Sequence, residues 1–402
     1  MTSPIFRILT YNVQCGIGTD RVYDPFRIGK WMGEQPQLDV VCCQEIEVND
    51  ENQGLKQSVR MGVSHNDNQP KILANALGVG WKGGQHFVVK KLMRKEVMTT
   101  GIPSSTPTLR TEQGTASSEI SIIQEAITNT NTASLEKWID AEPAVGEKFG
   151  WGCSIITKHK VLQRDAIRIP AQRSTCSSFL DSSKRGLSQA AGMKIEHPVF
   201  GKTYIVSLHC MADVLGFAID GIVGSLQLQN VRSVLKYLDN NIDKADTDNV
   251  IIVGDFNSIG GSGVIREMHS YQGEWGPFVD CARCCGDTEG TIPKFCKLRI
   301  DFVFLATKSK YLVPISSFVA KIEYSDHFPL TVTFGLADDN NTNKLKQVAS
   351  SQLCLAHFHR ICLVVLVGPL FLVFIPAFFF LYILFSLVTL VQKCLCGVSS
   401  NG

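Results

Sequence analysis

Short apolar segments of strand length alternate with amphipathic segments of helix length along most of this chain, and this alternation limits the folds that it can adopt. Residues 6–13 and 38–43 are strand-like, the second apolar at nearly every position, and residues 25–34 carry apolar side chains at helical spacing. Strands that are apolar on both sides need cover on both faces, so the pattern favours an α/β fold. A chain of 402 residues can build this as one large domain with two sheets.

The alternation continues beyond this first part of the chain. Further strands are predicted at 152–157, 202–208, 250–253, 300–305 and 330–334, and helices at 72–77 and 226–238. The segment 99–146 is rich in Thr, Ser, Asn and Pro, a composition that buries little apolar surface, so it predicts a flexible insertion. We therefore expect one domain over residues 1–338 that contains this insertion.

Polar side chains recur where the predicted strands stop. These positions are Asn12, Glu45, His209, Asp255 and Asn257. Another acid, Asp301, stands where a strand begins. Sheet proteins assemble their chemistry at strand ends and in the loops beside them, so we expect these side chains to converge on one site.

Three of the strand-end positions are suited to metal and phosphate. Glu45 follows the apolar run VVCCQ, where a carboxylate is costly unless its charge is neutralised. A hard divalent cation would neutralise it, since Mg²⁺ is commonly held by one or two carboxylates with water and phosphate oxygens. Asp255 and Asn257 occur in VIIVGDFNS, where the acid can hold a metal or its water and the amide can donate to phosphate. A salt-bridged or solvated Glu45 and a simple Asp-Asn turn are the alternatives.

Two histidines are candidates for proton transfer. His327 lies in YSDHFPL, directly before a predicted strand, and a histidine titrates close enough to working pH to be a general base. Such a base needs an orienting carboxylate, for which Asp301 in LRIDFVF is the candidate. His209 in VSLHC is a second imidazole, suited to a phosphate oxygen or to the leaving group. A single histidine is most often structural, so only the whole set predicts chemistry.

Taken together, these motifs resemble those of the endonuclease/exonuclease/phosphatase superfamily. The matching segments occur in the order of the family and span nearly all of residues 5–334; they are ILTYNVQCGIG, DVVCCQEIE, VSLH, VIIVGDFNS, LRIDFVF and YSDHFPL. The resemblance implies an α/β fold, a four-layer α/β/β/α sandwich with two mixed β-sheets, and an active site in a groove at one end. It also implies hydrolysis of a phosphate ester with Mg²⁺, or Mn²⁺, as cofactor.

The resemblance further implies which residues hold the metal and the substrate. Glu45 would be the main Mg²⁺ ligand. Asn12 and Asn257 would bind phosphate or support the metal, and Asp255 would position the attacking water.

The remaining candidates would move protons and stabilise charge. His327 would be the general base, oriented by Asp301, with Asp326 assisting nearby. His209 would stabilise the charge that develops on the phosphoryl group or protonate the leaving oxygen.

Residues 361–391 read ICLVVLVGPLFLVFIPAFFFLYILFSLVTLV, a run without a formal charge that is long enough to cross a bilayer. We expect a C-terminal transmembrane anchor here, after a polar linker at 339–360 and before a short tail at 392–402. Pro369 and Pro376 leave a single crossing and a re-entrant hairpin both open. No secretory signal opens the chain, so the catalytic domain is expected to be cytosolic.

The expected anchor narrows the choice of substrate. Neutral sphingomyelinases are family members with C-terminal membrane segments, and this chain is similar in layout. The similarity implies a phosphodiester of a membrane lipid such as sphingomyelin, with the bilayer as partner and no protein partner. A membrane-tethered nuclease, an inositol-phosphate phosphatase and an inactive membrane scaffold stay open. The formal charge of +2 excludes neither lipid nor nucleic acid, although it lacks the strong basic excess of a dedicated nucleic-acid binder.

Overall fold

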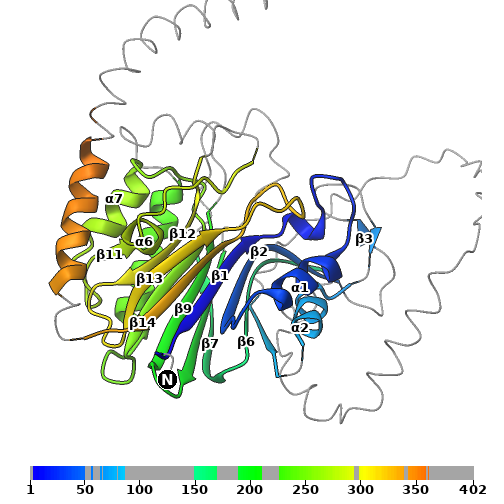
Figure 1. The fold of residues 1–402 in the computed structure, drawn as a ribbon, viewed down its shortest axis with the longest axis horizontal. Coiled ribbons are helices and arrows are strands. Elements are labelled where there is room, and N and C mark those ends of the chain that lie inside the picture. Colours follow the sequence, from blue (N-terminus) through cyan, green and yellow to red (C-terminus); the bar gives the residue numbers. More distant parts are fainter. Residues whose placement is uncertain are drawn as a thin grey trace, which may run out of the picture.

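The computed structural model describes most of the predicted domain and a helix that follows it. The described residues are 3–49, 56–57, 64–65, 67–78, 80–86, 149–169, 189–210, 226–293, 298–338, 343–358 and 361. Their strands form two six-stranded sheets and one short pair, β3 (Lys56–Gln57) with β4 (Ser64–His65) (Figure 1).

The first sheet contains the N-terminal strand. In spatial order its strands are β13 (Leu312–Val319), β14 (Leu330–Leu336), β1 (Phe6–Asn12), β2 (Val40–Asn49), β6 (Phe149–Thr157) and β5 (Lys82–His86). β1 runs parallel to β2, and the other neighbouring strands are antiparallel. The outer face of this sheet packs against α1 (Pro25–Glu34) and α2 (Gln69–Leu77). The side chain of Asp24 accepts the N–H of Arg27 and so caps α1 after the loop that follows β1.

The second sheet is also mixed. Its strands, in spatial order, are β11 (Phe278–Asp280), β12 (Asp301–Ala306), β10 (Asn249–Asp255), β9 (Gly201–His209), β8 (Gln189–His197) and β7 (Lys160–Arg168). β9 and β10 are parallel, and the other neighbouring strands are antiparallel. Its outer face packs against α6 (Leu226–Asn241) and α7 (Gly263–Ser270), and the short helix α8 (Cys281–Cys284) follows β11.

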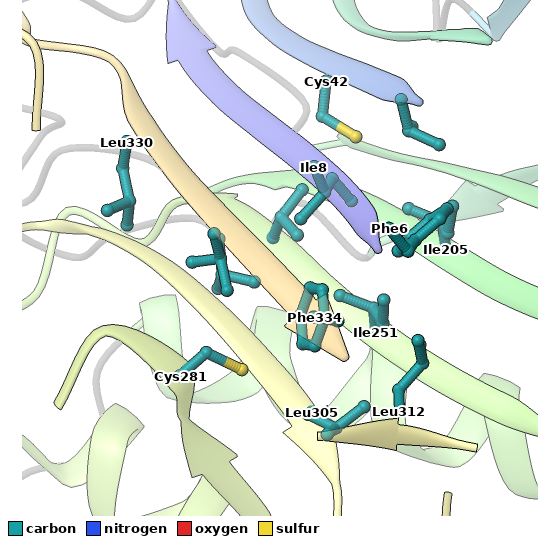
Figure 2. Close-up of a cluster of buried hydrophobic side chains, with 14 of the residues drawn as sticks. Phe6, Ile8, Cys42, Ile205, Ile251, Cys281, Leu305, Leu312, Leu330 and Phe334 are labelled. Atoms are coloured by element: carbon teal, nitrogen blue, oxygen red, sulfur yellow. The ribbon is translucent and has the colours of Figure 1, made fainter. Parts of the chain in front are cut away.

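The core between the two sheets follows the alternation of side chains along the strands. Phe6 and Ile8 of β1 face Ile205 and Ile251 of the second sheet within one buried cluster (Figure 2). The next residue, Leu9, points the other way and packs beneath α1 and α2. The layers therefore run helices, sheet, sheet, helices, and the predicted α/β fold with two mixed β-sheets is confirmed.

Several strands carry too weak a pattern to be predicted from sequence, namely β5, β7, β8, β11 and β13. β8 contains Gly192, where a Cβ would lie 2.1 Å from the Tyr204 hydroxyl. That hydroxyl donates a 2.6 Å hydrogen bond to Asp165 Oδ2 of β7, so the glycine makes room for a contact between strands. In β13 the register shifts after Pro314 and Phe318 is 60% exposed, as suits the edge of a sheet.

The segment that we expect to be a linker, 339–360, contains a helix at residues 343–358. Within the described part of the chain, we find no helix of sufficient length and apolarity to cross a bilayer. The predicted anchor at 361–391 lies outside that part except for Ile361. The predicted insertion at 99–146 and tail at 392–402 also lie outside it.

Candidate active site

Strands from both sheets bring predicted site residues to the same edge of the sandwich. The parallel strands β9 and β10 finish opposite each other at His209 and Asp255. β12 begins where β10 finishes, with Asp301 opposite Asp255. Asn12, the last residue of β1, donates a 3.0 Å hydrogen bond from Nδ2 to Asp255 Oδ2. The carboxylate of Asp255 therefore joins the two sheets at the predicted site.

Gly254 allows β10 to approach β9 this closely. Its φ of 134° is strained for any residue with a side chain, and a Cβ at this position would lie 1.9 Å from the carbonyl oxygen of Leu208. The glycine of the GDFN motif thus allows the close pairing of β9 and β10 that places Asp255 opposite His209.

Glu45 reaches the same point through a break in β2. The register of β2 shifts between Cys43 and Ile46, and Glu45 itself has a φ of 54°, in the left-handed region. Its side chain is only 2% exposed. Glu45 Oε1 lies 3.6 Å from His209 Nε2, and Asp255 Oδ2 lies 3.6 Å from the same nitrogen. Two buried carboxylates from different sheets therefore face one imidazole.

His327 and Asp301 form the predicted pair of imidazole and carboxylate. His327 Nδ1 lies 2.8 Å from Asp301 Oδ2, and its Nε2 lies 3.7 Å from Asp255 Oδ2. Burial opposes a positive charge on His327, but the neighbouring charges of Asp301 and Asp255 outweigh it and raise the pKa of His327 to about 10. Because Nδ1 is held by Asp301, Nε2 is the nitrogen that faces the other site residues.

The electrostatics around Asp255 fit a divalent cation. Burial raises the pKa of Asp255 to about 6, an effect that His327 and His209 oppose and that Asp301 increases. Because burial makes the negative charge of this carboxylate costly, a nearby cation would stabilise its ionised form. The available donors are hard carboxylate oxygens of Glu45 and Asp255, which suit Mg²⁺ or Mn²⁺ rather than a soft metal. Ligand atoms of Asp255, Asp301 and His327 also lie within 4.8 Å of one another.

Asn257 and Asp326 lie beside this centre and make different contacts. Asn257 Nδ2 donates to the carbonyl oxygen of Cys210 at 2.7 Å, and its backbone N–H donates to Asp255 Oδ1 at 2.8 Å. It therefore closes the turn after β10 and fixes Asp255. Asp326 is half-buried and adds to the negative charge around His327, and its Oδ1 lies 3.4 Å from Ser325 Oγ.

Two further residues that the sequence analysis does not select hold the site together. Ser325 Oγ donates to the carbonyl oxygen of Asn12 at 2.6 Å and accepts the N–H of His327 at 3.3 Å, so it joins the His327 loop to β1. Gln69 Oε1 accepts the N–H of Glu47 at 2.8 Å, and its Nε2 donates to the carbonyl oxygen of Cys15 at 2.7 Å. Ser325 could be found from its place in the SDH motif, whereas nothing in the sequence around Gln69 marks it.

A second cluster of metal-ligating side chains lies at the opposite ends of the strands. It consists of Asp39, His159 and His197, whose ligand atoms lie within 4.8 Å of one another. The N–H groups of Val199 and Phe200 both donate to His197 Nδ1, at 3.1 and 3.2 Å. That nitrogen therefore keeps its lone pair for them, and Nε2 carries the proton of the neutral ring. A ring held in this way offers a metal no lone pair, so we interpret the cluster as structural.

Several solved structures are similar to this chain at low sequence identity. An endonuclease/exonuclease/phosphatase from Beutenbergia cavernae DSM 12333 is 16% identical with a TM-score of 0.50, and the match covers 83% of this chain and 72% of that one. A family protein from Leptotrichia buccalis C-1013-b is 16% identical with a TM-score of 0.47, covering 82% and 99%. An endonuclease/exonuclease/phosphatase from Bacteroides vulgatus is 13% identical with a TM-score of 0.49, covering 83% and 100%.

The comparison with curated proteins found no match. The model of the Endonuclease/Exonuclease/phosphatase family, in contrast, matches residues 9–327, which include every predicted site residue. This match shows that the chain belongs to the endonuclease/exonuclease/phosphatase family.

Proposed function

We propose that this phosphoesterase hydrolyses the phosphodiester of a membrane phospholipid of the sphingomyelin class, with Mg²⁺ as cofactor. The observation that carries the proposed chemistry is the convergence of Glu45, Asp255, His209 and the His327–Asp301 pair at one edge of the sandwich. The proposed substrate rests on the apolar run at 361–391, which would hold this edge close to a bilayer.

The residues of the site divide the reaction between them. His327 is the general base, taking a proton from the attacking water at Nε2 while Asp301 holds Nδ1. Asn12 keeps Asp255 oriented towards the reacting phosphate through its 3.0 Å hydrogen bond. His209 Nε2, which faces both carboxylates, donates a hydrogen bond to a phosphoryl oxygen or a proton to the leaving oxygen.

A divalent cation fits beside the carboxylates of Glu45 and Asp255, which would hold it. When bound, the cation supplies positive charge that offsets the substrate phosphate and the two carboxylates, and so lowers the pKa of His327 towards neutrality. Asn257 supports this centre by fixing Asp255 through its backbone N–H.

The helix at 343–358 supports the membrane part of the proposal. It follows β14, whose last residue Leu336 lies at the end of the sandwich remote from the site. Gln352 then contacts Asp280, whose N–H donates to Oε1 at 2.9 Å and whose carbonyl oxygen accepts from Nε2 at 3.1 Å. The helix therefore runs back along the sandwich, from the end marked N towards the end at which β1 finishes (Figure 1).

The direction of this helix would bring the apolar run to the site. The last described turns expose Leu355, Phe358 and Ile361, which are 39%, 60% and 60% accessible. The run at 361–391 would then leave the domain on the side that carries the catalytic residues. A phosphodiester in the bilayer would meet such a tethered site at a high effective concentration.

The test is a substrate profile of the purified full-length protein in detergent micelles with Mg²⁺. We expect release of phosphocholine from sphingomyelin in mixed micelles, and no comparable turnover of soluble inositol phosphates or single-stranded oligonucleotides. Glu45→Gln, purified in the same way, is the control that separates the site's own activity from contaminants. Turnover of oligonucleotides alone would contradict the lipid substrate and would favour a membrane-tethered nuclease. Inactivity on every phosphoester would favour the inactive scaffold.

A further inference from the structure

A buried threonine, Thr291, bonds to the backbone of Asp301 and to that of Phe328, the residue after His327. Thr291 is fully buried. Its Oγ1 accepts the backbone N–H of Ile300 at 3.2 Å and of Asp301 at 3.3 Å. Its carbonyl oxygen accepts the N–H of Phe328 at 2.6 Å. Thr291 thus joins the start of β12, which carries Asp301, to the residue that follows His327 in the chain.

We propose that Thr291 is a positioning residue that sets the distance and orientation between Asp301 and His327. The inference deepens the proposed function, since it rests on this pair acting as the general base. Asp301 begins β12 of the second sheet. His327 lies just before β14 of the first sheet, 26 positions later in the sequence. Ser325 ties the His327 loop to β1 and pairing with β10 holds Asp301, whereas Thr291 bonds to the backbone on both sides of the 2.8 Å contact.

The hydroxyl of Thr291 is the feature that performs this task. One oxygen accepts two neighbouring N–H groups, so it fixes the turn by which the chain enters β12. The N–H of Thr291 in turn donates to the carbonyl oxygen of Leu298 at 3.0 Å, which adds a further bond to the segment that enters β12. Removing the hydroxyl would leave two buried N–H groups without their acceptor, and Asp301 would be free to shift away from His327.

The test compares Thr291→Val, which keeps the shape and removes the acceptor, with Thr291→Ser, which keeps the hydroxyl. Thr307→Val is the matched control. Thr307 is also fully buried, lies just beyond the other end of β12, and its hydroxyl has no hydrogen-bond partner among the described residues. We expect Thr291→Val to lower kcat about tenfold to a hundredfold with little change in KM, since small displacements of a base have effects of this size. Thr291→Ser should retain most of the activity, and Thr307→Val all of it.

A second measurement does not depend on turnover. In ¹⁵N-histidine-labelled protein, the Nδ1–H proton of His327 should resonate far downfield because it is hydrogen-bonded to Asp301. We expect this resonance in the wild type, in Thr291→Ser and in Thr307→Val, and its loss or a large shift in Thr291→Val. A Thr291→Val protein that folds, keeps the resonance and keeps kcat would overturn the proposal.

The two proposals fail in different ways. A wild type that hydrolyses oligonucleotides instead of lipid contradicts the proposed substrate, and the Thr291 series is then measured on oligonucleotides. A wild type without any turnover contradicts the proposed function, and the His327 resonance alone decides the role of Thr291. Equal losses of kcat in Thr291→Val and Thr307→Val, matched by equal losses of folded protein, would show a merely structural role and overturn the inference.

Discussion

Two of the site residues adopt the left-handed backbone conformation, which Asn tolerates better than Glu. Glu45 has a φ of 54° and Asn257 a φ of 45°, although neither is a glycine. Such conformations cost of order 1–3 kcal/mol each and persist where the surrounding structure enforces them. At Glu45 the bulge in β2 and the hydrogen bond from Glu47 N–H to Gln69 supply that enforcement. One of these residues is a proposed metal ligand, and the other fixes Asp255 through its backbone N–H.

Glu45→Gln tests the metal site at the scale of one residue. The amide keeps the shape of the side chain and removes the charge, so we expect loss of nearly all Mg²⁺-dependent turnover and little change in the thermal midpoint without metal. Added Mg²⁺ or Mn²⁺ should raise the midpoint of the wild type, because a ligand of the native state stabilises it, and should not raise that of the variant. Full activity or an unchanged metal response in the variant would show that Glu45 is not a ligand.

At the scale of single elements, strand β10 depends on Gly254. A Cβ there would meet the Leu208 carbonyl oxygen at 1.9 Å, and φ is 134°. We expect Gly254→Ala to cost at least about 2 kcal/mol of unfolding free energy, since it combines a clash with a strained backbone. It should also lower activity, because Asp255 would move away from His209. Denaturant unfolding measures the first effect and kcat the second, with Gly286→Ala as control, since φ there is 78° but no atom lies within 4 Å of the added Cβ.

Much of the fold and of the site could be predicted from the sequence, because the central strands are buried on both faces and are mostly apolar. β1, β2, β9, β10 and β12 have that pattern, and they carry Asn12, Glu45, His209, Asp255 and Asp301. The missed strands β8 and β13 lack it, since one makes room for a tyrosine at Gly192 and the other is an exposed edge. The SDH motif marks Ser325, but the roles of Gln69 and Thr291 could not be predicted, because nothing in the sequence around either residue marks the backbone groups that it holds.

The C-terminal helix at 343–358 was expected from its polar composition to be part of a linker, yet it packs on the domain. Leu345 and Ala349 belong to the core between the sheets, and Gln352 makes two hydrogen bonds to the backbone of Asp280. Composition alone does not reveal this, since the helix buries only a narrow stripe.

Two truncations separate the helix from the proposed anchor. A chain that ends at Phe358 should no longer associate with membranes. It should keep its thermal midpoint and its turnover of a soluble phosphodiester. A chain that ends at Asp338 should unfold at a lower temperature, because it loses the apolar contacts of Leu345 and Ala349 and the hydrogen bonds of Gln352. Equal midpoints for the two truncations would contradict the packing role, and persistent membrane association of the first would contradict the anchor.

At the scale of the whole molecule, the Asp39–His159–His197 cluster joins the two sheets at the ends remote from the site. His159 Nε2 lies 2.9 Å from Asp39 Oδ1, and the His159 and His197 rings lie 4.5 Å apart between centroids. Burial, and then the neighbouring His159, lower the pKa of His197 to about 4, while Asp39 opposes and Lys158 adds to this effect. The native state therefore favours a neutral His197.

This cluster predicts how stability depends on pH. The unfolded chain binds a proton on His197 near pH 6.5, whereas the native state does so only near pH 4. The neutral His197 therefore contributes roughly 1–2 kcal/mol to the free energy of unfolding. This contribution is fully present above pH 6.5 and is lost as the pH falls towards 4. His197→Asn keeps an acceptor near the position of Nδ1 and does not titrate, so its unfolding free energy should fall less over this range. If the unfolding free energies of the wild type and His197→Asn depended on pH in the same way, His197 would not be the titrating group.

The most direct test of the whole account is the position of the metal. Crystals of the protein soaked in Mn²⁺ should show one strong anomalous peak between the carboxylates of Glu45 and Asp255, on the side that faces His209. Such a peak would place the cation where the two sheets meet. A peak elsewhere, or none at saturating Mn²⁺, would contradict a metal-dependent phosphodiesterase built on these residues.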